Sequence, residues 1–313
     1  MAEAGTAIEV KGLHKSFGST VVLDGIDFTV ARGAVFCLLG PNGAGKTTVI
    51  NILTTLLRAD GGMATVNGFD VAKHGAEVRE SISLTGQFAA VDHLLTGREN
   101  LVLIGELRHV TDPVRTAGAL LEQFDLIAAA DRRTLTYSGG MRRKLDIALG
   151  LVGEPAIIFL DEPTTGLDPE SRNTTWDTIK SLADAGKTIF LTTQYLEEAD
   201  RLADKIAILS RGRVAAEGTP QALKSVLPHG QMELRFADAT QLAKAGQVLA
   251  DRQPSRSESA LTLTISTDGS VAQVNRLFSL LETAKVEVAE FAQKSPTLDD
   301  AFLQIINNNK GEA

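Results

Sequence analysis

The chain has 313 residues, of which 43% are apolar and only 5% aromatic, and its formal net charge is −8. This acidic balance argues against a general nucleic-acid binder, which needs a basic face, and the single cysteine, Cys37, excludes a disulfide within the chain. The length suits one large domain and one small domain. The single cysteine is typical of a protein in a reducing cytoplasm. No run approaches the ~20 apolar residues of a membrane-spanning helix, so we expect the protein to contact a membrane only through a partner.

The first part of the chain predicts strands followed by a helix. Residues 7–11 and 21–30 are predicted strands, joined by a turn at residues 17–19. Residues 34–39 are continuously apolar, as in a strand buried on both faces of a sheet. A helix is predicted from about Lys46 to Leu57. This order indicates an α/β domain.

A glycine-rich pattern lies between that strand and that helix. The segment Gly40-Pro41-Asn42-Gly43-Ala44-Gly45-Lys46-Thr47 fits the spacing G-x-x-x-x-G-K-[ST]. Glycines allow a backbone to wrap closely around phosphate and aim its N–H groups inward, and the start of the helix adds a positive dipole end. Lys46 is predicted to reach the β- and γ-phosphates and the Thr47 hydroxyl to bind Mg²⁺. A plain glycine-rich turn is the alternative; the nucleotide-binding residues we expect are Asn42, Gly43, Ala44, Gly45, Lys46, Thr47 and Thr48.

Two acidic residues follow a second apolar strand, predicted at residues 156–160. Asp161 in this position is predicted to hold Mg²⁺ through water. Glu162 is predicted to point toward the γ-phosphate, where it would orient and deprotonate water, a role worth roughly 10²–10⁴ in rate. Two acids after a strand can equally well cap a turn. Their place after a phosphate-binding pattern favours catalysis.

Composition shifts at residues 227–230, where we place a boundary between domains 1–227 and 228–313. Beyond it, predicted strands alternate with predicted helices, the strands over 232–236, 261–266 and 286–291 and the helices over about 238–250 and 270–283. Thr297 and Asp300 are predicted to cap a last helix. This small α/β module carries no constellation of catalytic side chains, and we expect it to be regulatory or to stabilise a dimer.

The segment Ser138-Gly139-Gly140, lying between the phosphate-binding pattern and the acidic strand, gives the chain a specific resemblance. Over about residues 7–220 the chain resembles the ATP-binding subunit of ABC transporters, and these three residues resemble the family's signature motif. The resemblance implies a P-loop NTPase fold with a helical subdomain at about 88–153. It also implies ATP and Mg²⁺ as ligands, and a homodimer in which the signature of one copy closes over the γ-phosphate held by the other.

Further roles are implied by the same resemblance. Phe17 matches an aromatic that stacks on adenine, although a packing residue is the alternative. Gln87 matches a glutamine that contacts Mg²⁺ and couples to the membrane subunit. Asp168 belongs to a loop that crosses the dimer interface, and residues 88–137 match the region that docks helices of a separate membrane permease.

The chain departs from the family pattern at three positions. Tyr137 and Met141 flank the signature where leucine and glutamine are usual, and Gln194 stands where the family has a switch histidine. Glutamine can donate a hydrogen bond to the γ-phosphate but carries no charge. Slow hydrolysis would therefore be unsurprising.

The runs 193–200 and 295–302 resemble the daunorubicin-resistance type of exporter ATPase. The expected function is therefore ATP hydrolysis that drives export of a drug-like or lipid-like compound, at the cytoplasmic face of a bacterial membrane. Two alternatives remain. A non-transport ABC ATPase would act on ribosomes or DNA, and a regulatory module would hold ATP but barely hydrolyse it, which the neutral Gln194 favours.

Overall fold

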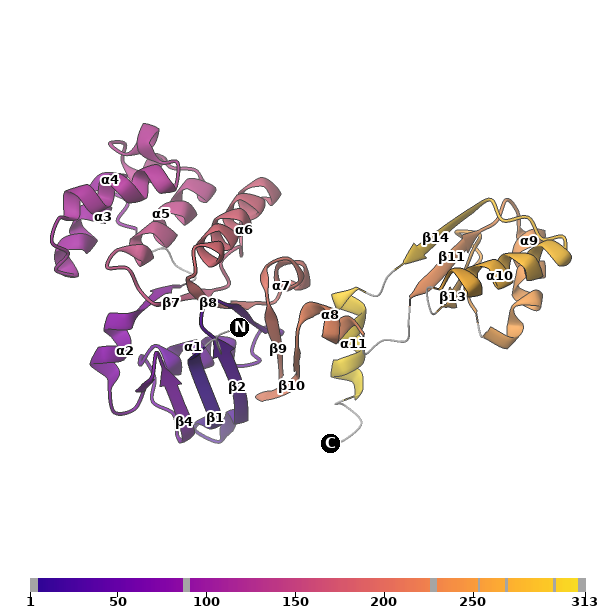
Figure 1. Ribbon diagram of the computed structural model, residues 1–313, viewed down its shortest axis with the longest axis horizontal. Coiled ribbons are helices and arrows are strands. Elements are labelled where there is room, and N and C mark those ends of the chain that lie inside the picture. Colours follow the sequence, from indigo (N-terminus) through magenta and orange to yellow (C-terminus); the bar gives the residue numbers. More distant parts are fainter. Residues whose placement is uncertain are drawn as a thin grey trace. The chain divides into compact units, whose positions relative to one another are not determined.

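The computed structural model describes residues 5–86, 91–225, 230–252, 254–267, 270–294 and 297–308. It divides the chain into two compact units, Met1–Pro220 and Gln221–Ala313, whose elements are labelled in Figure 1. The domain boundary predicted between residues 227 and 228 lies outside the described residues.

A six-stranded, mostly parallel sheet forms the centre of the first unit. Its strand order is β10-β9-β3-β8-β7-β6, with bounds Arg213–Gly218, Lys205–Ser210, Val35–Leu39, Thr188–Thr193, Ile157–Asp161 and Ile82–Thr85. Strands β3, β7 and β8 are buried along their whole length, as expected of parallel strands covered on both faces. The predicted strands 34–39 and 156–160 are therefore confirmed to within a residue.

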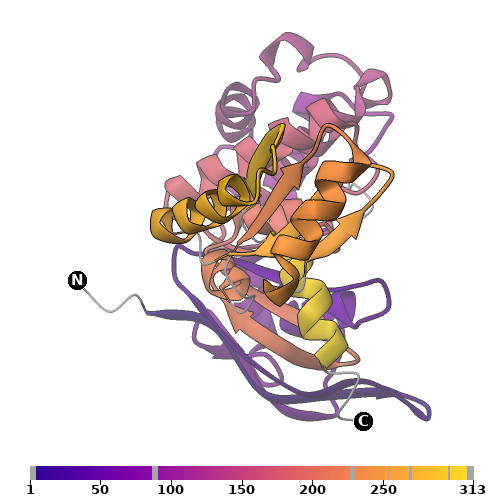
Figure 2. The same ribbon diagram turned by 90° about the vertical axis from the view of Figure 1, so that its right-hand side faces the viewer.

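A second, antiparallel sheet packs against this centre. Its strand order is β2-β1-β4-β5, with bounds Thr20–Ala31, Thr6–Phe17, Gly61–Val66 and Phe69–Asp70. Figure 2 shows the long β1–β2 hairpin, of which the predicted strands were only a part. Stacked rings of Phe28 and Phe36, with centroids 5.1 Å apart, join the two sheets, and Phe36 also stacks on Phe190 of the six-stranded sheet at 5.4 Å.

Side chains cap the starts of several helices of the first unit. Figure 1 shows α3, α4 and α5 grouped together, as expected for a helical subdomain. Asp112 and Ser138 cap α4 and α5 through their side chains. The predicted helix 46–57 is shorter, because Thr55 adopts a φ of 66° that an α-helix cannot accommodate. The helices are α1 Lys46–Leu53, α2 Gly75–Ser81, α3 Gly97–Leu107, α4 Pro113–Gln123, α5 Gly139–Leu151, α6 Pro169–Asp184, α7 Leu196–Leu202 and α8 Pro220–Lys224, which crosses the division between the units.

The second unit has its own sheet and its own core. The strand order is β12-β13-β11-β14, with bounds Ser255–Ser257, Thr262–Ser266, Gln231–Arg235 and Glu290–Lys294. Leu234, Leu263, Leu277 and Leu281 are among the residues of its hydrophobic core. The helices are α9 Ala239–Val248, α10 Val271–Thr283 and α11 Leu298–Asn308.

One predicted strand of this unit is misplaced. The prediction covered residues 286–291, whereas β14 begins at Glu290 and pairs with β11. Val286 is buried in the core and Val288 packs against it, so their apolar character reflects packing of the connection after α10 rather than strand pairing. The predicted cap of the last helix is confirmed, since the Thr297 hydroxyl accepts from the Asp300 N–H at 3.2 Å and the Asp300 carboxylate accepts from the Thr297 N–H at 3.1 Å.

Candidate functional site

A cavity of about 580 Å³ opens where the glycine-rich loop, the end of β7 and the end of β8 meet. Parallel strands commonly place their functional residues at this carboxyl edge. A larger groove of about 760 Å³ lies elsewhere, and its described lining contains none of the predicted site residues. The cavity at the loop is lined by Val22, Asn42, Gly43, Gly45, Lys46, Thr47, Thr48, Glu162, Thr165 and Gln194.

Gly45 makes the turn from the loop into α1 possible. Its φ is 106°, in a region that residues with a side chain rarely adopt. A Cβ atom at this position would also lie 2.8 Å from the Cδ2 atom of Leu23. The sequence therefore needs glycine here to bring the backbone N–H groups at the start of α1 to the cavity.

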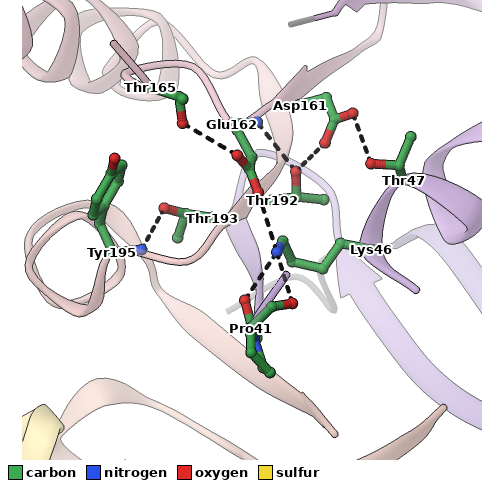
Figure 3. Close-up of polar contacts among 10 residues, drawn as sticks. Pro41, Lys46, Thr47, Asp161, Glu162, Thr165, Thr192, Thr193 and Tyr195 are labelled. Carbon is green, nitrogen blue, oxygen red and sulfur yellow. Dashed lines mark hydrogen bonds and ion pairs between the residues drawn. The ribbon is translucent and has the colours of Figure 1, made fainter. Parts of the chain in front are cut away.

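Lys46 is a buried cation held by three oxygens, as Figure 3 shows. Its Nζ atom donates to the carbonyl of Gly40 at 2.9 Å and to that of Pro41 at 3.2 Å. It also lies 3.1 Å from Oε1 of Glu162, and the two side chains are only 5% and 8% exposed. Each charge compensates the other at the cavity wall, which a buried pair requires.

Asp161 lies beside Thr47 at the end of β7. Its Oδ2 atom accepts from the Thr47 hydroxyl at 3.1 Å, and its Oδ1 atom accepts from the Thr192 hydroxyl. A hydroxyl next to a carboxylate is a suitable donor set for Mg²⁺, which prefers oxygen and keeps several waters. Within the described ranges there is no group of three or more His, Cys, Asp and Glu residues arranged for a metal. The geometry fits a magnesium ion bound through few protein ligands.

Glu162 combines an unusual backbone with a fully engaged side chain (Figure 3). Its φ is 48°, a strained conformation for a residue other than glycine. The Glu162 N–H donates to the Thr192 carbonyl at 3.1 Å, which holds the turn. Its Oε2 atom accepts from the Thr165 hydroxyl at 3.2 Å, while Oε1 faces Lys46. The carboxylate is thus aimed into the cavity.

The segment after β8 brings Gln194 to the same cavity. The Tyr195 N–H donates to the Thr193 hydroxyl at 2.9 Å, which fixes the turn into α7 on either side of Gln194. Gln194 and Glu162 therefore line the same cavity. Their catalytic roles stay predictions.

Comparison with known proteins bears on the same residues. The family described as ABC transporter matches residues 23–165. A daunorubicin resistance ATP-binding protein of Streptomyces coeruleorubidus is 44% identical over 306 residues, which cover 96% of this chain and 95% of that one. The chain belongs to the ABC transporter ATP-binding family. As a member, it has the P-loop NTPase fold and is an ATPase subunit.

Two further comparisons fit this membership. A Nod factor export ATP-binding protein of a Rhizobium species is 43% identical over 222 residues, or 69% of this chain and 72% of that one. Among solved structures, an ATP-binding cassette of an ABC transporter in its ADP conformation matches with a TM-score of 0.64 and 28% identity, over 70% of this chain and 92% of that one.

The ABC signature residues lie apart from the phosphate loop of their own chain. Ser138 caps α5, and its Oγ atom accepts from the Met141 N–H at 3.2 Å. Gly139 and Gly140 form the first turn of α5. Among the described residues that line the 580 Å³ cavity, none comes from this signature. The phosphate site within one chain therefore lacks the contribution that the family resemblance assigns to the signature.

Asp168 lies close to the signature helix rather than at the cavity. It caps α6, accepting from the Ser171 N–H at 2.9 Å and from the Ser171 hydroxyl at 2.6 Å. These hydrogen bonds lower the pKa of Asp168 below its ordinary value. A Cβ atom at Gly140 would lie 2.8 Å from Oγ of the same Ser171, so the starts of α5 and α6 are in close contact.

Tyr137, which stands where the ABC signature usually has leucine, packs inside the helical subdomain. The side chain is buried, and its hydroxyl donates to the Ala129 carbonyl at 2.7 Å. Burial raises the pKa of this hydroxyl. Tyr137 is therefore a packing residue of the helical subdomain, and its hydroxyl, the one polar atom of its side chain, makes a hydrogen bond.

Phe17 and Gln87 cannot be placed in the cavity. Phe17 ends β1 with about half of its surface exposed, and the Lys15 ammonium lies 5.5 Å from its ring centre. An exposed ring at a strand end is available for stacking, but adenine binding stays a prediction. Gln87 lies outside the described residues.

Sequence reasoning missed three residues of the site. Val22 and Thr165 line the cavity, and Thr192 holds both Asp161 and the Glu162 backbone. The only available signals were positional: Thr165 follows Glu162 closely, and Thr192 precedes Gln194. Of the predicted loop residues, Ala44 is buried behind the cavity rather than part of its described lining.

Proposed function

We propose that this chain is the ATP-hydrolysing subunit of a bacterial exporter, bound to the cytoplasmic face of the membrane through a separate permease. The observation that carries the proposal is that Lys46, Thr47 and Glu162 line one cavity, where the Thr47 hydroxyl also bonds to Asp161. The printed names of the relatives, daunorubicin resistance and Nod factor export, support an export role. Among the described helices none is long and apolar enough to cross a membrane. The cargo we propose is drug-like or lipid-like.

The proposed chemistry begins with the phosphates of ATP in the glycine-rich loop. The N–H groups at the start of α1 and the Lys46 ammonium bind the phosphate oxygens. Thr47 and Asp161 would hold Mg²⁺, which neutralises phosphate charge when bound. Because Lys46 now faces the phosphates, its contact with Oε1 of Glu162 weakens, and that carboxylate becomes available to a water.

Glu162 then acts as the general base. It orients the water and accepts its proton as the water oxygen bonds to the γ-phosphorus. The bond from the γ-phosphorus to the oxygen shared with the β-phosphate breaks, which leaves ADP and inorganic phosphate. The Thr165 hydroxyl fixes the other oxygen of Glu162 during this step. Gln194, on the same wall of the cavity, donates a hydrogen bond to the γ-phosphate.

We propose that two copies of the chain pair head to tail. Ser138, Gly139 and Gly140 place a serine and the N–H groups of a helix start together, and α5, described over its whole length, has no acidic residue in its first turn. Such a helix start attracts an anion. In the proposed homodimer it meets the γ-phosphate of the other copy, Asp168 lies at the shared interface, and Phe17 stacks on adenine.

The permease is proposed to dock on residues 88–137, beside the predicted coupling residue Gln87. Two large apolar side chains are exposed here, Leu94 by 74% and Leu135 by 66%. A hydrogen bond of 3.3 Å from the Leu135 N–H to the His93 carbonyl brings their segments together. Exposed apolar pairs of this kind suit a protein partner. ATP-driven closure of the dimer would reach the membrane through this contact.

A Glu162→Gln variant tests the proposal. Glutamine keeps the shape but cannot accept the proton, so we expect steady-state ATP hydrolysis to fall by about 10²–10⁴ and an ATP-bound dimer to accumulate on gel filtration. Glu80→Gln, an exposed acid on α2, is the matched control and should behave as wild type. A Glu162→Gln chain that stays monomeric with ATP and hydrolyses normally would contradict both the base and the dimer.

A regulatory ATP-binding module is the second candidate, favoured by Gln194 in the switch position. If the neutral side chain limits turnover, Gln194→His should raise the steady-state rate severalfold, because histidine can carry a proton near neutral pH. A wild-type rate that is already fast, and that falls in Gln194→His, argues for the exporter ATPase alone.

We also propose that residues 228–313 form an accessory domain that regulates or stabilises the dimer. Its core is separate from that of the first unit, and among its described residues only Thr262 and Thr267 are buried polar groups. A chain that ends at residue 227 should hydrolyse ATP but dimerise less tightly. Unchanged dimerisation and transport would remove this role.

A further inference from the structure

A buried carboxylate on α7 is used by none of the steps above. Glu198 is fully buried, and burial raises the pKa of its carboxyl, against which hydrogen bonds from Trp176 and Thr164 act. Its Oε2 atom has no hydrogen-bond partner among the described residues. A carboxyl group costs several kcal/mol to bury unless its hydrogen bonds are made. A carboxyl group that is buried despite this unfavourable energy is expected to have a structural role.

One oxygen of Glu198 joins two separate parts of the catalytic unit. Its Oε1 atom accepts from the Thr164 hydroxyl at 2.8 Å and from the Trp176 indole N–H at 2.9 Å. Both donor side chains are buried. Thr164 lies in the turn that follows Glu162, and Trp176 lies on α6. Glu198 itself lies on α7, which begins two residues after Gln194.

The turn containing Thr164 is also tied to Glu162 directly. The Thr165 N–H donates to the Glu162 carbonyl at 3.2 Å, and the Leu167 N–H donates to the Thr164 carbonyl at 3.2 Å. Moving Thr164 would therefore move the turn that holds the strained Glu162 backbone. The positive charge of Arg143, on the signature helix α5, also lowers the pKa of Glu198. The carboxylate on α7 therefore interacts with side chains of both α5 and α6.

We infer that Glu198 is a positioning residue, which holds the turn that follows Glu162 and the helix α7 that follows Gln194 in a fixed position relative to each other. The inference rests on the proposed roles of Glu162 and Gln194. Glu198 touches neither nucleotide nor water in this account. Because it acts through Thr164, its loss should misplace the two reacting groups while the phosphate loop, held by other contacts, still binds ATP.

The first test compares Glu198→Ala with Glu198→Gln in the full chain. Alanine removes the acceptor, and we expect kcat for ATP hydrolysis to fall about ten- to a hundredfold, since small misplacements of reacting groups have effects of this size. KM and the Kd for ATP should change less than about threefold. Glutamine can accept from Thr164 and Trp176 through its carbonyl, so kcat should return to within about threefold of wild type.

The matched control is Glu197→Ala, the exposed glutamate next to Glu198 on the same helix, which should leave kcat unchanged. A wild-type kcat in Glu198→Ala overturns the inference, and so does an equal loss in Glu198→Ala and Glu198→Gln. Wild-type turnover that falls in Glu162→Gln but not in Glu198→Ala overturns the positioning role alone. Undiminished turnover in Glu162→Gln overturns the proposed function instead.

If Glu198→Ala does not fold, two milder variants decide the matter. Thr164→Val and Trp176→Phe each remove one donor and keep most of the side chain, and each should lower kcat severalfold with a smaller change in KM. Folded variants with wild-type kcat overturn the inference.

Trp176 also provides a spectroscopic readout, because it is the single tryptophan of the chain. Its indole N–H donates to Glu198, so Glu198→Ala should shift the emission maximum while Glu198→Gln preserves it. An emission spectrum that is the same in Glu198→Ala and wild type shows that the indole does not bond to Glu198 and overturns the proposed network.

Discussion

Two glycine-containing turns of the first unit each precede a helix. They differ in whether they can bind a phosphate group without help from another element. The phosphate loop before α1 presents a buried ammonium, Lys46, already matched to the carboxylate of Glu162. The signature before α5 presents a hydroxyl and backbone N–H groups, with Ser138 engaged in capping. The first can bind a polyanion by charge. The three signature residues offer only uncharged donors, and we propose that they act on a phosphate that another element already holds.

The difference implies that nucleotide binding and hydrolysis should separate by mutation. Changes in the phosphate loop should remove both, whereas changes at the signature should remove hydrolysis and leave binding.

The largest effect is expected from Lys46→Ala. Loss of the ammonium removes charge-assisted hydrogen bonds to phosphate and leaves Glu162 as an uncompensated buried acid facing the nucleotide. We expect the Kd for ATP to rise about a hundredfold or more and hydrolysis to become undetectable, measured by a fluorescent ATP analogue and by phosphate release. Lys73→Ala, an exposed lysine paired with Asp70, is the control. Tight ATP binding in Lys46→Ala would remove the contrast between the two turns.

Gly140→Ala should have an intermediate effect of a different kind. The added methyl group lies 2.8 Å from Oγ of Ser171, so it displaces the contact between the starts of α5 and α6 and crowds the signature. Hydrolysis should fall about ten- to a hundredfold while the Kd for ATP stays within about twofold of wild type.

Gly118→Ala is the matched control, because a Cβ atom there meets open space and alanine favours the helix. It should raise Tm slightly without changing hydrolysis. An ATP affinity that falls as far as the rate in Gly140→Ala would show that the signature contributes to binding within one chain.

The smallest effect is expected from Asp168→Asn. The hydrogen bonds from Ser171 lower the pKa of Asp168 in the folded chain, so its charged form stabilises the fold above the unfolded pKa of about 3.9. That contribution disappears as pH falls through the lower folded value. Thermal unfolding should therefore show a small loss of Tm in Asp168→Asn at pH 7, shrinking toward pH 3. A loss of Tm that grows as the pH falls would contradict this assignment.

The sequence was most informative where backbone geometry and spacing decide the outcome. The phosphate loop needs glycine at a φ of 106° next to a lysine, and Ser138 and Asp112 cap helices by local hydrogen bonds, so both were predictable from neighbouring residues. The mixed α/β fold was also confirmed.

The remainder depended on contacts between distant segments. Thr192 supports Asp161 across two strands, and Glu198 differs from Glu197 only in which side of α7 faces the core. Val286 was taken for part of a strand because an apolar residue that packs after a helix looks the same in sequence. Partners of this kind become visible only when the chain is folded.

Mixing two impaired variants tests whether each site is shared between copies. Lys46→Ala destroys the phosphate loop of one chain and Gly140→Ala the signature of the other, and a mixed dimer would contain one intact site and one doubly damaged site. Random pairing should then restore up to about a quarter of the wild-type rate, because half of the dimers are mixed and each has one good site of two. A mixture whose rate equals the mean of the two separate variants would show that each chain hydrolyses ATP with its own residues alone, and the shared site would be wrong.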